Sequence, residues 1–257
     1  MRVILALTRE VSALLTSCEL THLPRVPIDV DLARRQHRAY EEALAAAGCV
    51  VERLGAGPDV PDSVFVEDIA VVFDELAIIT RPGAESRRAE TPAVAEALGR
   101  HRRLEVIQPP GTVDGGDVLV AGRRVYVGRS SRTNAKAVAQ MRQMLTPLGY
   151  TVCDVEVRGC LHLKSAVTAV ADDLLLANPA WIANDPFGGF EVVDVDPAEP
   201  MAANALRVGD EVIYPLAFPR TSDRLARRGL SLRMVDASEL AKAEGAVTCC
   251  SLIVRQD

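Results

Sequence analysis

The chain has 257 residues, 49% of them hydrophobic and 25% charged, proportions that are typical of a soluble globular protein. Its net charge of −6 and its pI near 5.4 argue against nucleic acid or an anionic membrane as the main partner. No apolar run approaches the length of a membrane span, and the apolar start is interrupted at Arg2 and is too short for a signal peptide.

The six cysteines lie far apart except for the pair Cys249-Cys250, and they lack the paired spacing of a metal site. Reduced thiols in a cytoplasmic protein are therefore expected. The length fits one large domain or two small ones.

The first predicted elements are a strand over Val3–Leu7 and a helix that Asp29 or Asp31 caps and Gly48 ends. A short strand over Cys49–Leu54 follows. Four later stretches share one pattern, in which an apolar run, a two-residue acidic or glycine-containing turn and a second apolar run predict a β-hairpin. The predicted hairpins span 65–80, 112–128, 161–177 and 203–216, with turns at Asp74-Glu75, Gly122-Arg123, Asp172-Asp173 and Gly209-Asp210.

Helices and short strands separate the hairpins. Helical patterns are found over about 89–99, 133–147 and 221–228, with a weak one over 178–184, and short strands are predicted near Val106, Val152, Val192 and Met234. A fifth hairpin is predicted from the two chain ends, where Cys249–Val254 would pair with Met1–Leu7.

A polar residue near the start of each hairpin recurs at intervals of 47, 48, 42 and 45 residues, at Glu67, Asp114, His162, Asn204 and Cys249. A period in this range is typical of repeated supersecondary units. Five units whose ends join in one hairpin predict radial closure, as in a propeller. The equivalent residue of each unit would then face a central axis.

Cys249 and Cys250 open the last predicted strand, where neighbouring side chains point to opposite faces, so one thiol can pack inward while the other enters a cavity. Most free cysteines are merely small buried hydrophobic residues. His162, between two leucines in a predicted strand, would by itself be interpreted as a core histidine. The repeat nevertheless brings His162 to Cys249, and this pair supplies the nucleophile and acid–base group of acyl or amidine transfer.

Carboxylates occupy the equivalent positions of two other units. Asp114 precedes two glycines, which permit close backbone approach, and an inward carboxylate there could orient His162. The same stretch could instead form a turn. Glu67 and Asp68 could likewise be charges that protect an edge strand from aggregation.

A cavity that holds three or four carboxylates requires a cationic ligand. A guanidinium fits, because its planar donor fork binds a carboxylate in a bidentate way, through two hydrogen bonds. Arg87 and Arg132 follow two of the hairpins and would lie at one rim of the propeller, which suggests a carboxylate at the other end of the ligand. These features together describe arginine or a derivative of it.

The chain resembles the dimethylarginine dimethylaminohydrolase family, one of the guanidino-modifying enzymes of the pentein superfamily. The resemblance covers nearly the whole chain, in the same order. The motifs that carry it are Phe65-Val66-Glu67-Asp68, Arg81-Pro82-Gly83-Ala84-Glu85-Ser86-Arg87-Arg88, Val113-Asp114-Gly115-Gly116-Asp117-Val118-Leu119, Arg132-Thr133-Asn134, Leu161-His162-Leu163-Lys164-Ser165 and Thr248-Cys249-Cys250-Ser251.

The resemblance implies an α/β fold, a five-bladed ββαβ propeller with pseudo-fivefold symmetry, in a single catalytic domain over residues 1–257. It implies hydrolysis of Nω-methylated arginines to citrulline and a methylamine, without a metal or organic cofactor. By the same resemblance Cys249 is the nucleophile, His162 the general acid and base, and Asp114 the third member of the site.

The resemblance also implies a set of substrate contacts. Glu67 and Asp68 would hold the guanidinium, and Asp62 the α-amine. Arg87 and Arg132 would bind the α-carboxylate. Backbone carbonyls would also reach the amine, from Leu20 in a mobile lid over about 14–25 and from Ala243.

Two other functions are considered. One is a deiminase that acts on unmethylated arginine, although long bacterial arginine deiminases carry a helical insertion for which this chain has no room. The other is a non-catalytic propeller used for binding, as in the related ribosome anti-association factor, which would not need both Cys249 and His162. The expected partner is a small-molecule substrate, with neither nucleic acid nor membrane, for a monomer or homodimer.

Overall fold

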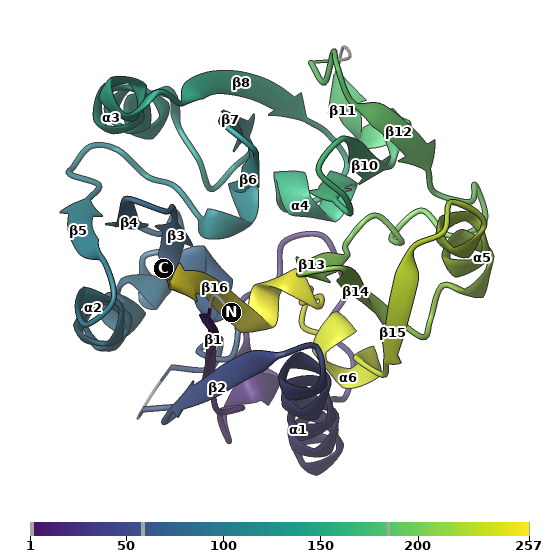
Figure 1. The fold of residues 1–257 in the computed structure, drawn as a ribbon. Coiled ribbons are helices and arrows are strands. Elements are labelled where there is room, and N and C mark those ends of the chain that lie inside the picture. The colour runs from purple at the N-terminus through teal and green to yellow at the C-terminus, as the bar shows by residue number, and fades with distance from the viewer. Residues whose placement is uncertain (1–2, 58–59, 184–185, 257) are drawn as a thin grey trace.

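A computed structural model describes residues 3–57, 60–183 and 186–256 of the chain. Five small mixed sheets surround a central axis, near which both ends of the described chain lie (Figure 1). Met1 and position 184, which belong to predicted elements, lie outside the described residues. Among the described residues, no helix has the length and apolar character needed to cross a bilayer.

Each sheet repeats one arrangement of strands. The strand nearest the axis pairs antiparallel with a second strand, and the second pairs parallel with a third. In chain order of the inner strand, the sheets are β3 (Ala70–Val72), β4 (Leu76–Ile79) and β5 (Arg103–Val106); β6 (Val118–Ala121), β7 (Arg124–Arg129) and β8 (Thr151–Val157), with β11 (Ile182–Ala183); β9 (Val167–Ala169), β10 (Leu174–Ala177) and β12 (Glu191–Asp194); β13 (Leu206–Val208), β14 (Glu211–Pro215) and β15 (Ser231–Val235); and β16 (Ser251–Gln256), β1 (Val3–Arg9) and β2 (Cys49–Leu54).

In four of the five sheets a helix on the outside connects the second and third strands, since a parallel pair requires a crossover (Figure 1). Between β10 and β12 the described residues instead form the 3₁₀ turn Pro179–Trp181 and β11. The crossover helices are α1 (Val30–Ala46), α2 (Thr91–Gly99), α3 (Ala135–Leu145) and α5 (Pro219–Arg227), and the short helices are α4 (Leu163–Ala166) and α6 (Ser238–Ala241). Single 3₁₀ turns cover Leu15–Ser17, Val66–Ile69, Ser86–Glu90, Gly115–Asp117, Thr146–Leu148, Pro179–Trp181 and Thr248–Cys250. The expectation of a five-bladed ββαβ propeller is confirmed.

The predicted hairpins and most helices are confirmed. All four hairpins form, and β1 pairs antiparallel with β16, so the two chain ends close the ring. Asp29 caps α1 by accepting a hydrogen bond from the Leu32 amide. The helix predicted over 178–184 is wrong, because Ile182 and Ala183 pair with β8 instead.

The structure corrects the local conformation at the axis. Glu67 and Asp68 lie in a 3₁₀ turn, His162 is the residue before α4, and Cys249 lies in a 3₁₀ turn before β16, so none of them is on the predicted strand. The inner strands β3, β6, β9 and β16 each begin directly after a helical turn, and β3, β6, β9 and β13 have only three or four residues. The argument from strand alternation therefore does not apply to Cys249 and Cys250.

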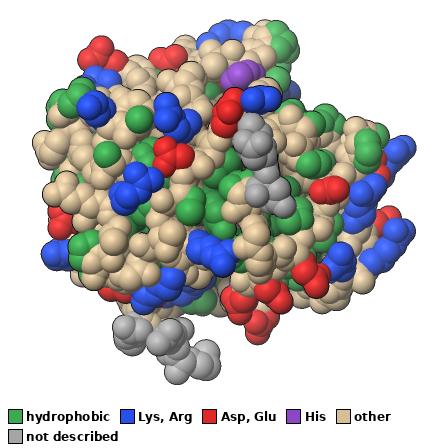
Figure 2. Space-filling model, turned by 90° about the horizontal axis from the view of Figure 1, so that it is seen from above, with side chains coloured by type: hydrophobic (Ala, Val, Ile, Leu, Met, Phe, Trp, Pro, Cys, Tyr) green, Lys and Arg blue, Asp and Glu red, His purple; other side chains and the backbone are tan. Residues whose placement is uncertain are grey.

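The core is divided into clusters that join each sheet to its helix and to the next sheet. One of them joins Leu76 of β4 and Val125 of β7 to Met141 and Leu145 of α3. This packing fixes the relative positions of the units, and therefore of the polar turns at the axis. On the outside, Figure 2 shows basic and acidic side chains interspersed on one face of the molecule.

Candidate active site

A cavity of about 20 Å³ lies among the polar turns, with room for little more than one water molecule. Eight of the ten predicted site residues line it, which brings together side chains that are far apart in the chain. It is lined by Glu19, Asp62, Phe65, Asp68, Arg87, Asp114, Arg132, Leu161, His162, Ala243, Glu244, Gly245 and Cys249.

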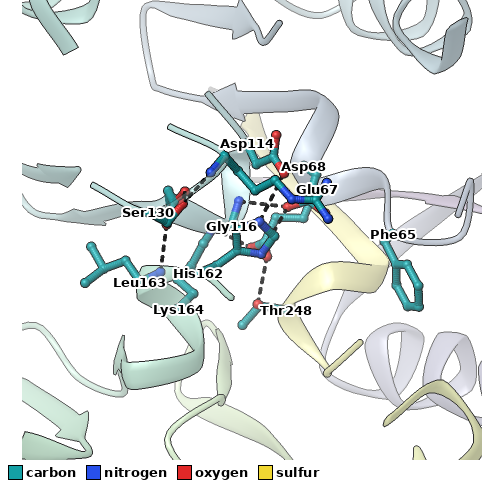
Figure 3. A network of polar contacts seen from close by, with 12 residues as sticks. Phe65, Glu67, Asp68, Asp114, Gly116, Ser130, His162, Leu163, Lys164 and Thr248 are labelled. Atoms are coloured by element: carbon teal, nitrogen blue, oxygen red, sulfur yellow. Dashed lines mark hydrogen bonds and ion pairs between the residues drawn. The ribbon is translucent and has the colours of Figure 1, made fainter. Parts of the chain in front are cut away.

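His162 lies between two carboxylates (Figure 3). Its Nε2 is 3.1 Å from Oδ2 of Asp114, and its Nδ1 is 3.8 Å from Oδ1 of Asp68. Burial alone would lower the pKa of His162, but the charges of Asp68 and Asp117 and the hydrogen bond of Asp114 raise that pKa to about 9. The imidazole is therefore protonated at neutral pH and can act as an acid.

Cys249 lines the cavity, whereas Cys250 is 1% exposed and belongs to the hydrophobic core. The 3₁₀ turn over Thr248–Cys250 separates the two side chains in this way. Burial, followed by the charges of Glu67 and Asp68, raises the pKa of the Cys249 thiol well above its ordinary value. The thiol is therefore neutral in the closed site.

Glycines let the turns meet at the axis. A Cβ on Gly116 would lie 2.6 Å from Nδ1 of His162, and one on Gly115 would lie 2.0 Å from the Glu67 carbonyl oxygen. A Cβ on Gly245 would lie 2.1 Å from the Phe65 ring. The glycine pair after Asp114 is thus required by the close approach of three units.

Asp68 is held by donors on both of its oxygens. The Gly116 amide donates to Oδ1 at 3.0 Å, and Nη1 of Arg87 donates to Oδ2. Burial would raise the pKa of Asp68, but His162 and Arg87 hold it below its ordinary value. Asp68 is therefore an anion that faces the cavity.

Arg87 is 5% exposed and bonds mainly within the protein. Its Nε and Nη2 donate to the Glu90 carboxylate at 3.0 and 2.9 Å, and Nη2 also donates to the Phe65 carbonyl at 2.9 Å. Nη1 contacts only Asp68 among the described residues. One N–H of Nη1 is thus left for a ligand carboxylate, and Arg87 also fixes Asp68.

Glu67 faces away from the small cavity. Its carboxylate accepts hydrogen bonds from Nζ of Lys164 at 2.5 Å and from the Thr248 hydroxyl at 2.8 Å. These three residues line a second cavity of about 440 Å³, whose wall includes the inner strands of all five sheets. Glu67 therefore lies behind Asp68 as seen from the small cavity.

The segment predicted as a lid, residues 14–25, contacts the substrate-binding candidates. The Glu19 amide donates to both oxygens of Asp62 at 3.2 Å, and Nη2 of Arg132 donates to the Thr21 hydroxyl at 2.9 Å. Leu20 packs against the core cluster and is not among the residues that line the cavity. In this structure the lid therefore bonds to Asp62 and Arg132, the side chains expected to bind the α-amine and the α-carboxylate of the substrate.

Glu244 fastens the lid, a contact that the sequence interpretation missed. Its carboxylate accepts hydrogen bonds from the consecutive amides of Thr21, His22 and Leu23 at 3.0, 2.5 and 2.6 Å. The backbone of Glu244 also has a φ of 58°, in the left-handed region that residues other than glycine rarely adopt. Its position next to Ala243 was the only available signal in the sequence.

Glu90, Lys164 and Asp117 were also missed, although the last two lie inside the recognised motifs. Among the described residues, one group of three potential metal ligands has its ligand atoms within 4.8 Å of one another, namely Asp68, Asp114 and His162. Because His162 is protonated and Asp68 is bonded to Arg87, the closed site uses these atoms for ion pairs instead.

The chain has close relatives among known proteins. The family model "N,N dimethylarginine dimethylhydrolase, eukaryotic" matches residues 26–193. The N(G),N(G)-dimethylarginine dimethylaminohydrolase of Streptomyces coelicolor is 44% identical over 253 residues, covering 98% of this chain and 97% of the relative.

Two solved structures are also similar. The C249S mutant of the Pseudomonas aeruginosa enzyme, complexed with citrulline, has a TM-score of 0.92 and 36% identity over 96% of this chain and 98% of its own. A dimethylarginine dimethylaminohydrolase H162G adduct with S-methyl-L-thiocitrulline also has a TM-score of 0.92 and 36% identity, over 98% of this chain and 100% of its own.

Proposed function

Because the chain belongs to the dimethylarginine dimethylaminohydrolase family, we propose that its central cavity hydrolyses Nω-methylated arginine through Cys249 and His162. The protein is a C–N hydrolase that converts asymmetric dimethylarginine or monomethylarginine to citrulline and the corresponding methylamine. The observation that carries the assignment of roles is that Cys249, His162, Asp114 and Asp68 line one cavity.

The Cys249 thiol first releases its proton to solvent, because the protonated His162 cannot accept it. Sγ of the resulting thiolate then attacks the guanidinium carbon. The new C–S bond gives a tetrahedral intermediate. His162, protonated between Asp68 and Asp114, then donates its proton to the methylated nitrogen, because an amide-like anion cannot leave. The C–N bond breaks, the amine departs, and a thiouronium cation remains on Cys249.

The second step is hydrolysis of the thiouronium. His162, now neutral, accepts a proton from the attacking water, and the C–S bond breaks to return the thiolate and release citrulline. The second proton of the water leaves the product oxygen and protonates the released amine in solution, and the thiolate regains its own proton from solvent. Asp114 bonds to Nε2 of His162 and stabilises its cationic form in both steps.

The ends of the substrate are assigned to groups on either side of the cavity. Asp68, with Glu67 behind it, balances the guanidinium charge. Asp62, supported by the Ala243 and Leu20 carbonyls, accepts the α-amine. The α-carboxylate is bound by Arg132 and by the remaining N–H of Arg87, in place of the Thr21 hydroxyl that Arg132 now contacts.

The lid must open before substrate can enter, because the closed cavity holds little more than one water molecule. A substrate that enters would replace the Glu19 amide at Asp62 and the Thr21 hydroxyl at Arg132. We propose that this catalytic unit, residues 1–257, functions in the cytoplasm as a monomer or homodimer and needs no cofactor.

The experiment that tests the function compares citrulline release from arginine, monomethylarginine and asymmetric dimethylarginine at equal concentrations. The proposal expects turnover of the two methylated substrates and a far lower kcat/KM for arginine. A higher kcat/KM for arginine would replace the assignment by a deiminase. Wild-type protein that releases no citrulline from any of them would contradict the catalytic proposal.

A further inference from the structure

One buried carboxylate, Asp117, lies three residues after Asp114 and is bonded to the two segments that carry Arg132 and His162. Asp117 is 0% exposed and does not line the small cavity. Its Oδ1 accepts a hydrogen bond from the Leu163 amide at 2.9 Å, next to His162 in the chain. Its Oδ2 accepts from the hydroxyls of Ser130 and Thr133, at 2.5 and 2.6 Å. The same two hydroxyls are also hydrogen-bonded to the backbone of residues at the site.

Each hydroxyl donates to Asp117 and accepts a backbone amide of a site residue. The Ser130 oxygen accepts from the Arg132 amide at 3.0 Å, and the Thr133 oxygen accepts from the Asp114 amide at 3.3 Å. Figure 3 shows Ser130 and Leu163 beside Asp114 and His162. Because a hydroxyl has one proton, its bond to the carboxylate directs its lone pairs toward these amides.

We infer that Asp117 is a positioning residue that sets the relative placement of the acid–base His162, its partner Asp114 and the carboxylate-binding Arg132. It contacts no substrate. The inference rests on the roles proposed above for those three residues. It adds that the ionised carboxylate of Asp117 affects both kcat and KM.

The charge of Asp117 is maintained by these contacts. Burial raises the pKa of Asp117 to about 6, while His162 and the hydrogen bonds from Ser130, Thr133 and the Leu163 amide oppose a larger increase. At neutral pH the side chain is therefore ionised and can accept all three hydrogen bonds. The packing around it is tight, since a Cβ on Gly128 would lie 2.8 Å from Oδ1.

Asp117→Asn is the informative variant, because asparagine has the same shape but one donor group. If its amide nitrogen replaces Oδ2, the Ser130 and Thr133 hydroxyls cannot donate there. If the nitrogen replaces Oδ1, it faces the Leu163 amide, and two donors meet. Neither orientation preserves the network.

The expected result is a fall of about 10- to 100-fold in kcat per active site and a rise in KM, since a misplacement near 1 Å costs about 100-fold. Ser130→Ala breaks only the branch to Arg132 and should raise KM about 3- to 10-fold with kcat nearly unchanged. Thr133→Val breaks only the branch to Asp114 and should lower kcat more than it raises KM.

The control is Thr168→Val. Thr168 is also a buried threonine whose hydroxyl joins two segments, donating to the Ala203 carbonyl at 2.7 Å and accepting from the Ala205 amide at 3.1 Å. This variant should lose thermal stability to a similar degree while keeping kcat and KM. In every preparation, Cys249 alkylation is measured by mass spectrometry with and without substrate. The fraction of Cys249 that the substrate protects from alkylation gives the fraction of functional sites.

The measurements are kcat and KM per functional site for asymmetric dimethylarginine, together with the thermal unfolding midpoint. Wild-type kcat and KM in Asp117→Asn, or losses in Thr133→Val no different from those in Thr168→Val, would overturn the inference. If Asp117→Asn does not fold, a rise confined to KM in Ser130→Ala together with a fall mainly in kcat in Thr133→Val supports the inference, and the absence of this difference overturns it. An inactive wild type would instead contradict the proposed function.

Discussion

Nε2 of His162 lies 3.1 Å from Oδ2 of Asp114, and this contact joins the second and third units of the ring at the axis. Asp68 is on the other side of the imidazole, 3.8 Å from Nδ1. A histidine between two carboxylates carries a proton at neutral pH, so the resting site already holds the acid that the leaving amine requires.

Asp114→Asn should therefore move the alkaline limb of the pH profile of kcat/KM to lower pH. Activity requires protonated His162, and its pKa of about 9 predicts a loss of activity as the pH rises through that value. Asparagine removes one charge that raises this pKa, while Asp68 and Asp117 remain. The measurement is kcat/KM for asymmetric dimethylarginine between pH 6 and pH 10, and an unmoved limb would contradict the role of Asp114. Asp74→Asn, in the exposed β3–β4 turn, is the control.

Cys249→Ser should abolish citrulline release, whereas Cys250→Ser should leave a measurable rate. Only Cys249 lines the cavity, and the Cys250 thiol contacts the Ala246 carbonyl at 3.5 Å inside the core. The measurement is steady-state citrulline release, with circular dichroism to verify that both variants fold. Full activity of the Cys249→Ser protein would eliminate the covalent mechanism.

The repeat predicted the architecture correctly because its signals are local. Two-residue turns such as Gly209-Asp210 and the capping residue Asp29 act within a few positions of the chain. The near-constant interval between polar residues then predicted radial closure. The helix predicted over 178–184 failed because Ile182 and Ala183 gain a sheet partner that lies far away in sequence.

The conformation at the axis could not be predicted from local pattern. The apolar run around His162 favours a strand, but contacts with other units select a turn there, as the tight approach of Gly116 to His162 shows. The partners of Glu67 and Arg87 were hidden for the same reason, since Lys164 is 97 residues from Glu67. Eight of the ten residues predicted from residue identity meet at the small cavity, but the direction in which the Glu67 side chain points was not predicted.

Arg132→Ala should raise KM far more than it lowers kcat. The guanidinium would bind a carboxylate remote from the reacting carbon, and it makes this contact equally in the ground and transition states. Loss of one charge-assisted hydrogen bond costs about 1.5–3 kcal/mol, which corresponds to roughly 10- to 150-fold in KM. Arg129→Ala, which removes a half-exposed arginine from the same segment, should change neither constant. A large fall in kcat with KM unchanged would exclude the anchoring role.

Glu244→Ala should release the lid. The variant removes the acceptor of three consecutive amides, Thr21 to Leu23, and keeps the unfavourable backbone conformation at residue 244. Amide hydrogen exchange at residues 21–23 should therefore accelerate in the free enzyme, by at least about tenfold for the loss of charge-assisted bonds. Glu244→Gln, which keeps one acceptor oxygen, should give a smaller increase. Exchange at the wild-type rate in Glu244→Ala would show that other contacts hold the lid.

The resting state of Cys249 should be a neutral thiol that is activated by the substrate. Burial and the charges of Glu67 and Asp68 raise its pKa, and the protonated His162 does not reverse that effect. A guanidinium bound at Asp68 would add a positive charge next to the sulfur and lower the pKa. This arrangement differs from papain-like enzymes, whose resting site is a thiolate–imidazolium pair.

The measurement is the pH dependence of Cys249 alkylation by a neutral reagent, with and without an unreactive guanidine too small to cover the sulfur. The free enzyme should show an apparent thiol pKa above the ordinary value of about 8.5, and the guanidine should lower it. Cys250→Ser serves as the background, since it removes the neighbouring thiol and leaves the cavity residue in place. A free-enzyme pKa well below 8.5, or one that the guanidine does not change, would show that the nucleophile is activated by the protein alone, because no charge of the substrate would then be needed to form the thiolate.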